Sequence, residues 1–482
     1  MTQSHSLLKS ANFSNAKAAL LKELISGSEK VSGIRPSTPE TQEAYLKQIQ
    51  TLGKDKGRES YYPYLASGLG SGPYVELMDG SVKMDLITGI GINFFGHSHP
   101  ELISEMINGL GSDVMQGNLQ PGYESQELIR AVLSKVGEKS RLKHGWLLCS
   151  GTMSNEIALK IIRQKKFPAT KIFAFQDCFA GRSTAMQEIT DNPKYREGQP
   201  TYGEVSYLPF YLPRLGLERS VELTVSHMQW EVDRHPGKFA GLMLEIVQGE
   251  GGFNSAPREY YVKLFEAAKK ANLAIWADEI QTFGRTEQLF AYQMFGLEEY
   301  IDVVTIGKLL QACMTLYTEE FNPRPGLVAG TFSGSSVALK TGRRIVELLT
   351  EGGYYGKDGR IAKLSQRFMD HFKRMSEGSC KGIIGECRNI GGMVAFTPYS
   401  GTMDDIKKVL FKLFEAGVVA FYCGHGPYLI RLLPPLGVMT EKQVDEACAI
   451  IEKVLIASAP EVPTASGASA PVASVVMKGT QS

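Results

Sequence analysis

The sequence predicts an α/β protein built around a mainly parallel sheet. Between about residues 100 and 350, short apolar runs alternate with segments of helical periodicity. This alternation is typical of βαβ units, in which a helix connects two parallel strands. A chain of 482 residues is also long enough to form more than one packed region.

Five apolar runs are the expected strands of this sheet. They are HGWLLCS (144–150), TKIFAFQD (170–177), FAGLMLEIV (239–247), LAIWAD (273–278) and IDVVTIG (301–307). Apolar residues recur at helical spacing in the segments that are expected to cover the sheet, which are 101–110, 124–137, 153–165, 258–271 and 335–350. Closer to the N-terminus, PYVELMDGSVKMDL (73–86) predicts a β-hairpin, because its Asp-Gly pair favours a tight turn.

Composition along the chain divides it into four segments. We expect an N-terminal segment over 1–85, a large α/β domain over 86–350 and a smaller α+β domain over 351–457. The helices expected in the smaller domain are 360–375, 404–416 and 440–456. Residues 458–482 are rich in Ala, Pro and Ser, which predicts a disordered tail.

Bulk properties exclude several classes of protein. A net charge of +1 gives no electrostatic reason to bind nucleic acid or a membrane surface. The longest apolar runs fall well short of the roughly 20 residues that a spanning helix needs. The N-terminus has no long apolar signal core, and the seven cysteines show no CxxC spacing. We therefore expect a cytoplasmic protein with neither a nucleic-acid nor a membrane partner.

The run AIWADEIQTFGRT ends in two adjacent carboxylates, Asp278 and Glu279. A buried carboxylate needs a cation, a metal or hydrogen-bond donors. Because side chains alternate along a strand, only one of the two acids can face a site, and we expect that acid to be Asp278. Ligands in open α/β sheets collect at the carboxyl ends of the strands, where this pair is expected to lie.

Two other kinds of site could use such an acid. A P-loop ATPase would need GxxxxGK followed by Ser or Thr, yet none of the four Gly-Lys pairs of this chain has that continuation. A metal hydrolase could use His97 and His99 in FGHSHPEL. A histidine beside a proline that starts a helix is more often a packing or capping residue, so we predict no metal.

A third kind of site pairs Asp278 with a cationic heterocycle. Pyridoxal phosphate (PLP) needs an acid at its ring nitrogen, a lysine for a Schiff base and a cup for its phosphate. Lys308 follows the next expected strand, and Ser150, Gly151 and Thr152 precede a helix whose free N–H groups suit a phosphate. Together these residues could supply the acid, the amine and the phosphate cup that PLP needs.

The chain also resembles a family, the class III (ω-type) aminotransferases of PLP fold type I. This group includes the acetylornithine, ornithine, lysine 6- and 4-aminobutyrate aminotransferases. The resemblance runs in order from about Tyr74 to Val438. It rests on GINFFGHSHPEL, SGTMSNEIALKIIR, CFAGRSTA, LEIVQGEGG, ADEIQTFGRT, TIGK, GTFSGSS and LIRLLPPLGV. The resemblance implies a large domain with a seven-stranded sheet, and a smaller domain formed by the N- and C-terminal segments.

The resemblance also implies roles for individual residues. Lys308 is expected to form the Schiff base and to move protons, and Asp278 to hold the pyridine nitrogen. The other cofactor contacts that it implies are Ser150, Gly151 and Thr152 on the phosphate, Phe179 stacked on the ring, Gln281 near the ring hydroxyl, and Thr331 on the phosphate of the neighbouring subunit. Arg182 and Arg431 are expected to bind substrate carboxylates. Glu250 is expected to pair with Arg431 when the amine lacks that carboxylate, although Arg182 and Glu250 could instead form structural salt bridges.

The expected activity is transfer of an amino group from an ω-amino acid or diamine-type donor to a keto acid, with 2-oxoglutarate as the acceptor. The reaction would be ping-pong, in a homodimer with active sites at the interface. An aminomutase or a decarboxylating aminotransferase of the same fold remains an alternative, as does a PLP-binding protein without activity. An intact Lys308, Asp278 and Gln281 argue against the last of these.

Several positions depart from the family pattern and leave the amino donor open. Ala180 replaces a histidine or an aromatic residue, and Ile246 replaces a proline. The segment after the lysine lacks the usual glycine run and is similar to the Gln-x-Cys variant of lysine 6-aminotransferases. Ser335 and Ser336 stand where Asn-Pro is usual.

Overall fold

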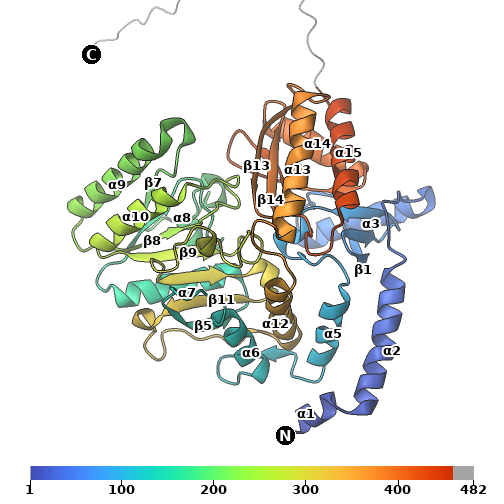
Figure 1. The fold of residues 1–482 in the computed structure, drawn as a ribbon, viewed down its shortest axis with the longest axis horizontal. Helices are drawn as coiled ribbons and strands as arrows, with labels where there is room; N and C mark the ends of the chain where they lie inside the picture. The colour runs from blue at the N-terminus through green and yellow to red at the C-terminus, as the bar shows by residue number, and fades with distance from the viewer. Residues whose placement is uncertain (1, 460–482) are drawn as a thin grey trace, which may run out of the picture.

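The computed structural model describes residues 2–459, and its largest element is a seven-stranded sheet (Figure 1). The strand order is β5-β11-β10-β9-β8-β6-β7. The strands are β5 (Leu142–Leu148), β6 (Lys171–Phe175), β7 (Val205–Leu208), β8 (Phe239–Leu244), β9 (Ala274–Glu279), β10 (Val303–Ile306) and β11 (Cys313–Thr318). All pairs from β10 to β7 are parallel, and β11 is antiparallel to both of its neighbours. The prediction of a mainly parallel sheet is confirmed.

Helices bury both faces of this sheet. Alternate residues of β9 belong to two separate apolar clusters: Ala274 and Trp276 pack in one, and Ile275 and Ala277 in the other. This is the pattern of a strand covered on both sides. The helices of this domain are α6 (Tyr123–Leu133), α7 (Gly151–Lys165), α8 (Thr184–Ile189), α9 (Gly216–Arg234), α10 (Arg258–Lys270), α11 (Ala291–Met294) and α12 (Ser336–Glu351).

Two strands of the sheet were not predicted. β11 follows the lysine-bearing turn. All but its first residue are buried, so it shows no alternation of buried and exposed positions. β7 has four residues at the sheet edge, which is too short to give a periodic signal.

The predicted hairpin forms and connects the two ends of the chain. β2 (Tyr74–Leu77) and β3 (Val82–Asp85) are antiparallel, and β3 also pairs in parallel with β15 (Val418–Val419). β1 (Ala66–Ser71) completes this four-stranded sheet. The preceding helices α1 (Gln3–Leu8) and α2 (Ala11–Ser28) lie along the outside of the molecule, at the lower right of Figure 1.

The C-terminal region forms a second antiparallel sheet beside three helices, at the upper right of Figure 1. Its strands are β13 (Ile384–Ile390), β14 (Met393–Pro398), β16 (Phe421–Cys423) and β17 (Leu429–Leu432). The three helices match those expected there and are α13 (Arg360–Glu377), α14 (Met403–Glu415) and α15 (Glu441–Ala457). Nearly all of the predicted tail, from residue 460 on, lies outside the described residues.

The remaining regular elements are short or connect these regions. They are α3 (Pro39–Lys56), α4 (Thr88–Gly91), α5 (Pro100–Gly109), β4 (Met115–Gln116) and β12 (Gly334–Ser335), with 3-10 turns at Pro193–Tyr195, Pro213–Leu215, Lys308–Leu310 and Glu319–Phe321. None of the helices within 2–459 is long and apolar enough to cross a membrane.

The last two residues of β9, Asp278 and Glu279, have different surroundings. Glu279 is fully buried and accepts hydrogen bonds from the backbone N–H groups of Ala291 (2.7 Å) and Tyr292 (2.9 Å), and from Thr282 Oγ1 (3.0 Å). It therefore holds the N-terminus of α11. Burial raises its pKa to about 7, and these three hydrogen bonds oppose that rise. Its structural role agrees with the sequence-based expectation.

Replacing Glu279 with alanine should destabilise the fold, because two buried backbone N–H groups and one hydroxyl lose their acceptor. We expect the free energy of unfolding to fall by about 2–4 kcal/mol. Denaturant unfolding would measure the loss. Glu319→Ala is the control, since this exposed carboxylate pairs with His144 at the surface and should matter by less than about 0.5 kcal/mol. Equal stability of the two variants would contradict this account.

Candidate active site

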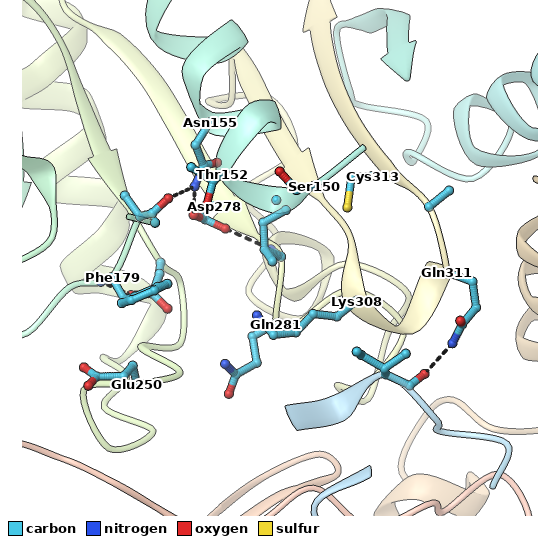
Figure 2. A pocket seen from close by; sticks show the side chains of 17 residues that line it. Ser150, Thr152, Asn155, Phe179, Glu250, Asp278, Gln281, Lys308, Gln311 and Cys313 are labelled. Atoms are coloured by element: carbon cyan, nitrogen blue, oxygen red, sulfur yellow. Dashed lines mark hydrogen bonds between the residues drawn. The ribbon is translucent and has the colours of Figure 1, made fainter. Parts of the chain in front are cut away.

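A cavity of about 390 Å³ opens at the carboxyl ends of β9 and β10 (Figure 2). Its size is within the range of small-molecule sites. Most of the predicted site residues line it, namely Ser150, Gly151, Thr152, Phe179, Glu250, Asp278, Gln281 and Lys308. The predicted residues Arg182, Thr331 and Arg431 are not part of its wall as formed by residues 2–459.

Lys308 lies in the turn that follows β10, next to the strand that carries Asp278. β9 and β10 pair in parallel with Thr305 opposite Asp278, so both residues reach the same sheet edge. Lys308 has a φ of +45°, a strained conformation for a residue with a side chain, and such strain is concentrated at functional sites. Burial lowers the pKa of its amine, and the negative charge of Asp278 opposes this shift. The buried amine can therefore lose its proton more easily than a solvated lysine.

Asp278 is 4% exposed and held in one orientation by two donors. Its Oδ1 accepts from the Ile280 N–H at 2.9 Å, and its Oδ2 accepts from Asn155 Nδ2 at 2.7 Å. Burial raises the pKa of the Asp278 carboxyl to about 6, although both hydrogen bonds and Lys308 favour the charged form. The carboxylate is thus held in one orientation, but its partners do not fully offset the cost of burying its charge. A cation in the cavity would stabilise it.

Asn155 belongs to the cavity wall and was not predicted from the sequence. It lies on α7 and lines the cavity, and the same Nδ2 also donates to the Ala180 carbonyl at 2.6 Å. It therefore connects the strand-end acid to the loop that carries Phe179. Asn155 follows Gly151 by four residues, so both lie on one face of α7. A polar residue at that spacing inside an apolar helix was the available signal.

The start of α7 supplies a site for an anion. Ser150 is the N-cap and accepts from the Met153 N–H at 3.2 Å, while the first-turn N–H groups of this 15-residue helix have no partner in the helix itself. Gly181 approaches from the neighbouring loop with a φ of +135°. A Cβ atom there would lie 2.6 Å from Thr152 Oγ1, so only glycine fits this contact.

Glu245 is a buried carboxylate that connects two loops of the site. Its Oε1 accepts from the Phe179 N–H (2.9 Å), and its Oε2 accepts from the Gly249 N–H (2.8 Å). Burial, followed by the nearby charge of Asp278, raises the pKa of Glu245 to about 8. Glu245 therefore positions the loop of Phe179.

The three predicted substrate residues occupy a connected corner of the site. Arg431 is 3% exposed, and within residues 2–459 its hydrogen bonds go to neutral oxygens, the Gly249 carbonyl and Gln281 Oε1, both at 3.4 Å. The Glu250 carboxylate forms no ion pair with Arg431 and is bonded instead to His425 (2.6 Å) and Tyr195 (3.1 Å). The exposed Arg182 stacks on the Tyr195 ring, with its guanidinium carbon 3.8 Å from the ring centroid.

The other residues singled out from the sequence, His97, His99, Thr331 and Ser335, lie outside the cavity wall. His97 Nε2 lies 3.1 Å from Asp85 Oδ2, and the His99 ring meets that of Phe95 edge-on at 5.4 Å, immediately before α5. Ser335 caps α12 by accepting from the Ala338 N–H at 3.1 Å, which explains a serine at that departure from the family pattern. Thr331 is exposed, away from the cavity of its own chain.

Comparison with known proteins assigns this arrangement to a class. The family model described as Aminotransferase class-III matches residues 58–455. The chain therefore belongs to the class III aminotransferases, which are enzymes dependent on PLP, as the sequence motifs predicted.

Individual relatives agree with this assignment. Acetylornithine aminotransferase of Caldanaerobacter subterraneus is 26% identical, covering 80% of this chain and 93% of that protein. Acetylornithine aminotransferase of Mycolicibacterium smegmatis is 28% identical, covering 82% and 94%. The structure of a lysine aminotransferase from M. tuberculosis superposes with a TM-score of 0.76 at 18% identity, covering 85% of this chain and all of that one. This likeness confirms the predicted fold.

The residues around the cavity fit PLP. The Asp278 carboxylate is buried and undercompensated, as a residue facing a pyridinium nitrogen should be. Lys308 offers an amine from the adjacent strand, and the start of α7 offers N–H groups for a phosphate. Asn155 Oδ1 is also buried, and none of the described residues donates a hydrogen bond to it. Acid, amine and anion site thus surround one cavity of suitable size.

The raised pKa of Asp278 gives a testable pH dependence in the cofactor-free protein. The unfolded carboxyl loses its proton near its ordinary value of 3.8, whereas the folded carboxyl keeps it until about pH 6. Between these values the unfolded state binds fewer protons, so this residue's contribution to stability falls as pH rises. Two pKa units correspond to about 3 kcal/mol.

Asp278→Asn removes this titration. Its unfolding free energy relative to the wild type should therefore improve by up to about 3 kcal/mol between pH 4 and pH 7. Denaturant unfolding of both cofactor-free proteins at several pH values would measure the difference. A constant difference across this range would show that Asp278 is ionised throughout.

Proposed function

We propose that this enzyme transfers an amino group from an ω-amino acid or diamine-type donor to 2-oxoglutarate by a ping-pong mechanism. The observation that carries the proposal is the placement of Lys308 and Asp278 at adjacent strand ends, on one cavity with the start of α7. Two acetylornithine aminotransferases among the relatives support a donor whose reacting amine is distant from the α-carboxylate.

Bound PLP would act as the electron sink that makes the donor's amine-bearing carbon acidic. Lys308 would hold the cofactor covalently through Nζ and, once released, would move the proton from that carbon. The lowered pKa of the amine favours the neutral base that this step requires. Asp278 would hold the ring nitrogen, Phe179 would pack on the ring, and Ser150, Gly151 and Thr152 would bind the phosphate. Gln281 would lie near the ring oxygen.

Arginine would select the second substrate. Arg431 is buried beside Gln281 and has no carboxylate partner among residues 2–459. A buried guanidinium of this kind suits a bidentate carboxylate. Arg182 would bind the other carboxylate of 2-oxoglutarate from the rim. Glu250 follows Gly249, whose carbonyl contacts Arg431, so Glu250 is close enough to pair with Arg431 when the donor has no carboxylate there.

Lys308→Ala should abolish transamination while leaving the fold intact. Without the amine, the purified protein should lack the absorbance band near roughly 400–430 nm that covalently held PLP gives. Spectra of both proteins after PLP addition would test this. The matched control is Lys143→Ala, on β5. A persistent band in the Lys308 variant would show that another amine holds the cofactor.

An amine panel would identify the donor and separate the alternative reactions. Ornithine, N-acetylornithine, lysine, 4-aminobutyrate and diamines should be scored by conversion of PLP to its amine form. We expect conversion with ω-amines and recovery on adding 2-oxoglutarate. Turnover without a keto acid would indicate an aminomutase, and CO2 release would indicate a decarboxylating enzyme. A lack of conversion with every amine would favour a non-catalytic protein.

We also propose that the enzyme is a homodimer in which Thr331 reaches the partner's phosphate site. Phe332, next to Thr331 in the chain, is 60% exposed. The Thr331 carbonyl packs on the segment that contains Gly117. Leu119 is 93% exposed and follows Asn118, whose N–H donates to the Gly330 carbonyl, next to Thr331, at 3.0 Å. Large apolar side chains exposed together are typical of an interface.

Leu119→Glu should weaken this interface, because it would bury a charge between subunits. We expect monomers in sedimentation velocity and at least tenfold weaker PLP binding, since the partner's threonine would be lost. Leu7→Glu, on the exposed N-terminal helix, is the control. A monomeric wild-type enzyme would contradict the proposal.

A further inference from the structure

His425 lies at the point where the C-terminal domain meets the cavity. It occupies the loop between β16 and β17, a hairpin in which Phe421 pairs with Arg431. Its Nδ1 lies 2.8 Å from Asp177 Oδ1, and its Nε2 lies 2.6 Å from Glu250 Oε2. These acids follow β6 and β8, so one imidazole bridges two loops of the large domain.

Both oxygens of Glu250 are occupied by this arrangement. Oε2 faces His425, and Oε1 accepts from the Tyr195 hydroxyl at 3.1 Å. The backbone is fixed as well, because the Gly424 N–H donates to the Glu250 carbonyl at 2.8 Å. The hydrogen bonds to Asp177 and Glu250 raise the pKa of His425 to about 10, so the imidazole is charged at neutral pH. A charged donor between two carboxylates makes strong hydrogen bonds.

Arg431, unlike Glu250, is incompletely bonded. Its guanidinium reaches the carbonyl of Gly249, the residue directly before Glu250, yet forms no ion pair with that carboxylate. Its Nε is buried and has no acceptor in the described part of the chain. A buried, incompletely bonded cation beside a carboxylate should attract it, so another interaction must hold Glu250 away.

We propose that His425 is a positioning residue that holds Glu250 away from Arg431 and thereby keeps Arg431 open for the carboxylate of the keto-acid acceptor. Asp177 fixes the imidazole from the other side, and Tyr195 assists by holding the second oxygen of Glu250. The resting enzyme is thus set for the dicarboxylate half of the cycle. Pairing of Glu250 with Arg431 requires the bond to His425 to break. This inference rests on the proposed role of Arg431 in acceptor recognition.

The proposal predicts a selective loss in His425→Ala. Freed from the imidazole, Glu250 would neutralise Arg431 and compete with an incoming carboxylate. The PLP-loaded enzyme should then bind glutarate, a dicarboxylate that cannot react, at least tenfold more weakly by calorimetry. KM for 2-oxoglutarate should rise by a similar factor. The half-reaction with a diamine should change by less than about twofold, because a diamine places no carboxylate on Arg431.

A second substitution separates positioning from general damage. In His425→Ala/Glu250→Gln, the freed side chain carries no charge, so glutarate affinity should return to within about twofold of Glu250→Gln alone. Tyr195→Phe removes only the other hydrogen bond and should weaken glutarate binding in the same direction by a smaller factor. The control is His144→Gln, because His144 contacts Glu319 at the surface, and this variant should bind glutarate as the wild type does.

The outcomes are distinguishable. Unchanged glutarate affinity in His425→Ala, or a loss that persists in the double variant, would overturn the positioning role. Arg431→Gln tests the proposed function separately and should abolish measurable glutarate binding. If Arg431→Gln bound glutarate normally, acceptor recognition by Arg431 would be wrong and the positioning role would fall with it.

Discussion

The parallel pairing of β9 with β10 is the constraint on which the site depends. It places an acid and an amine at adjacent strand ends of a sheet whose two faces are covered by helices. Burial raises the pKa of Asp278 and lowers that of Lys308. Both groups therefore carry their charges at a cost that a bound cofactor can offset, and the fold is prepared for an ionic ligand before the ligand arrives.

Around this pair, the residues of the site are held by two different kinds of contact. Asn155 and Glu245 hold loops beside the cavity, and their bonds are made among elements around the seven-stranded sheet. Arg431 and His425 instead come from β17 and the loop before it in the C-terminal sheet, and they contact the loop that follows β8. In our proposal, the cofactor is therefore held by elements of one sheet, whereas substrate choice depends on how the two sheets meet.

The sequence predicted much of this because its signals are local. Strand ends, the Asp-Gly turn and the helix start at Ser150 each follow from a few neighbouring residues. β11 was missed because Thr315 and Thr318, although buried, interrupt the apolar run by which the other buried strands were recognised. Asn155 and His425 were missed for another reason: each is defined by partners more than 20 residues away, such as Ala180, Asp278 or Glu250. Such contacts exist only after the sheet and the domains have come together.

The two acids that end β9 make strand register part of the chemistry. A slip of one residue exchanges the faces of a strand, so Glu279 would enter the cavity and Asp278 would face α11. The longer acid would then enter the space that we propose for the ring nitrogen. Close packing accompanies the observed register, since Gly241 lies opposite Ala274 and a Cβ on Gly241 would lie 2.7 Å from the Ala274 carbonyl. An apparently plain glycine on the neighbouring strand thus belongs to the packing of the register in which Asp278 lines the cavity.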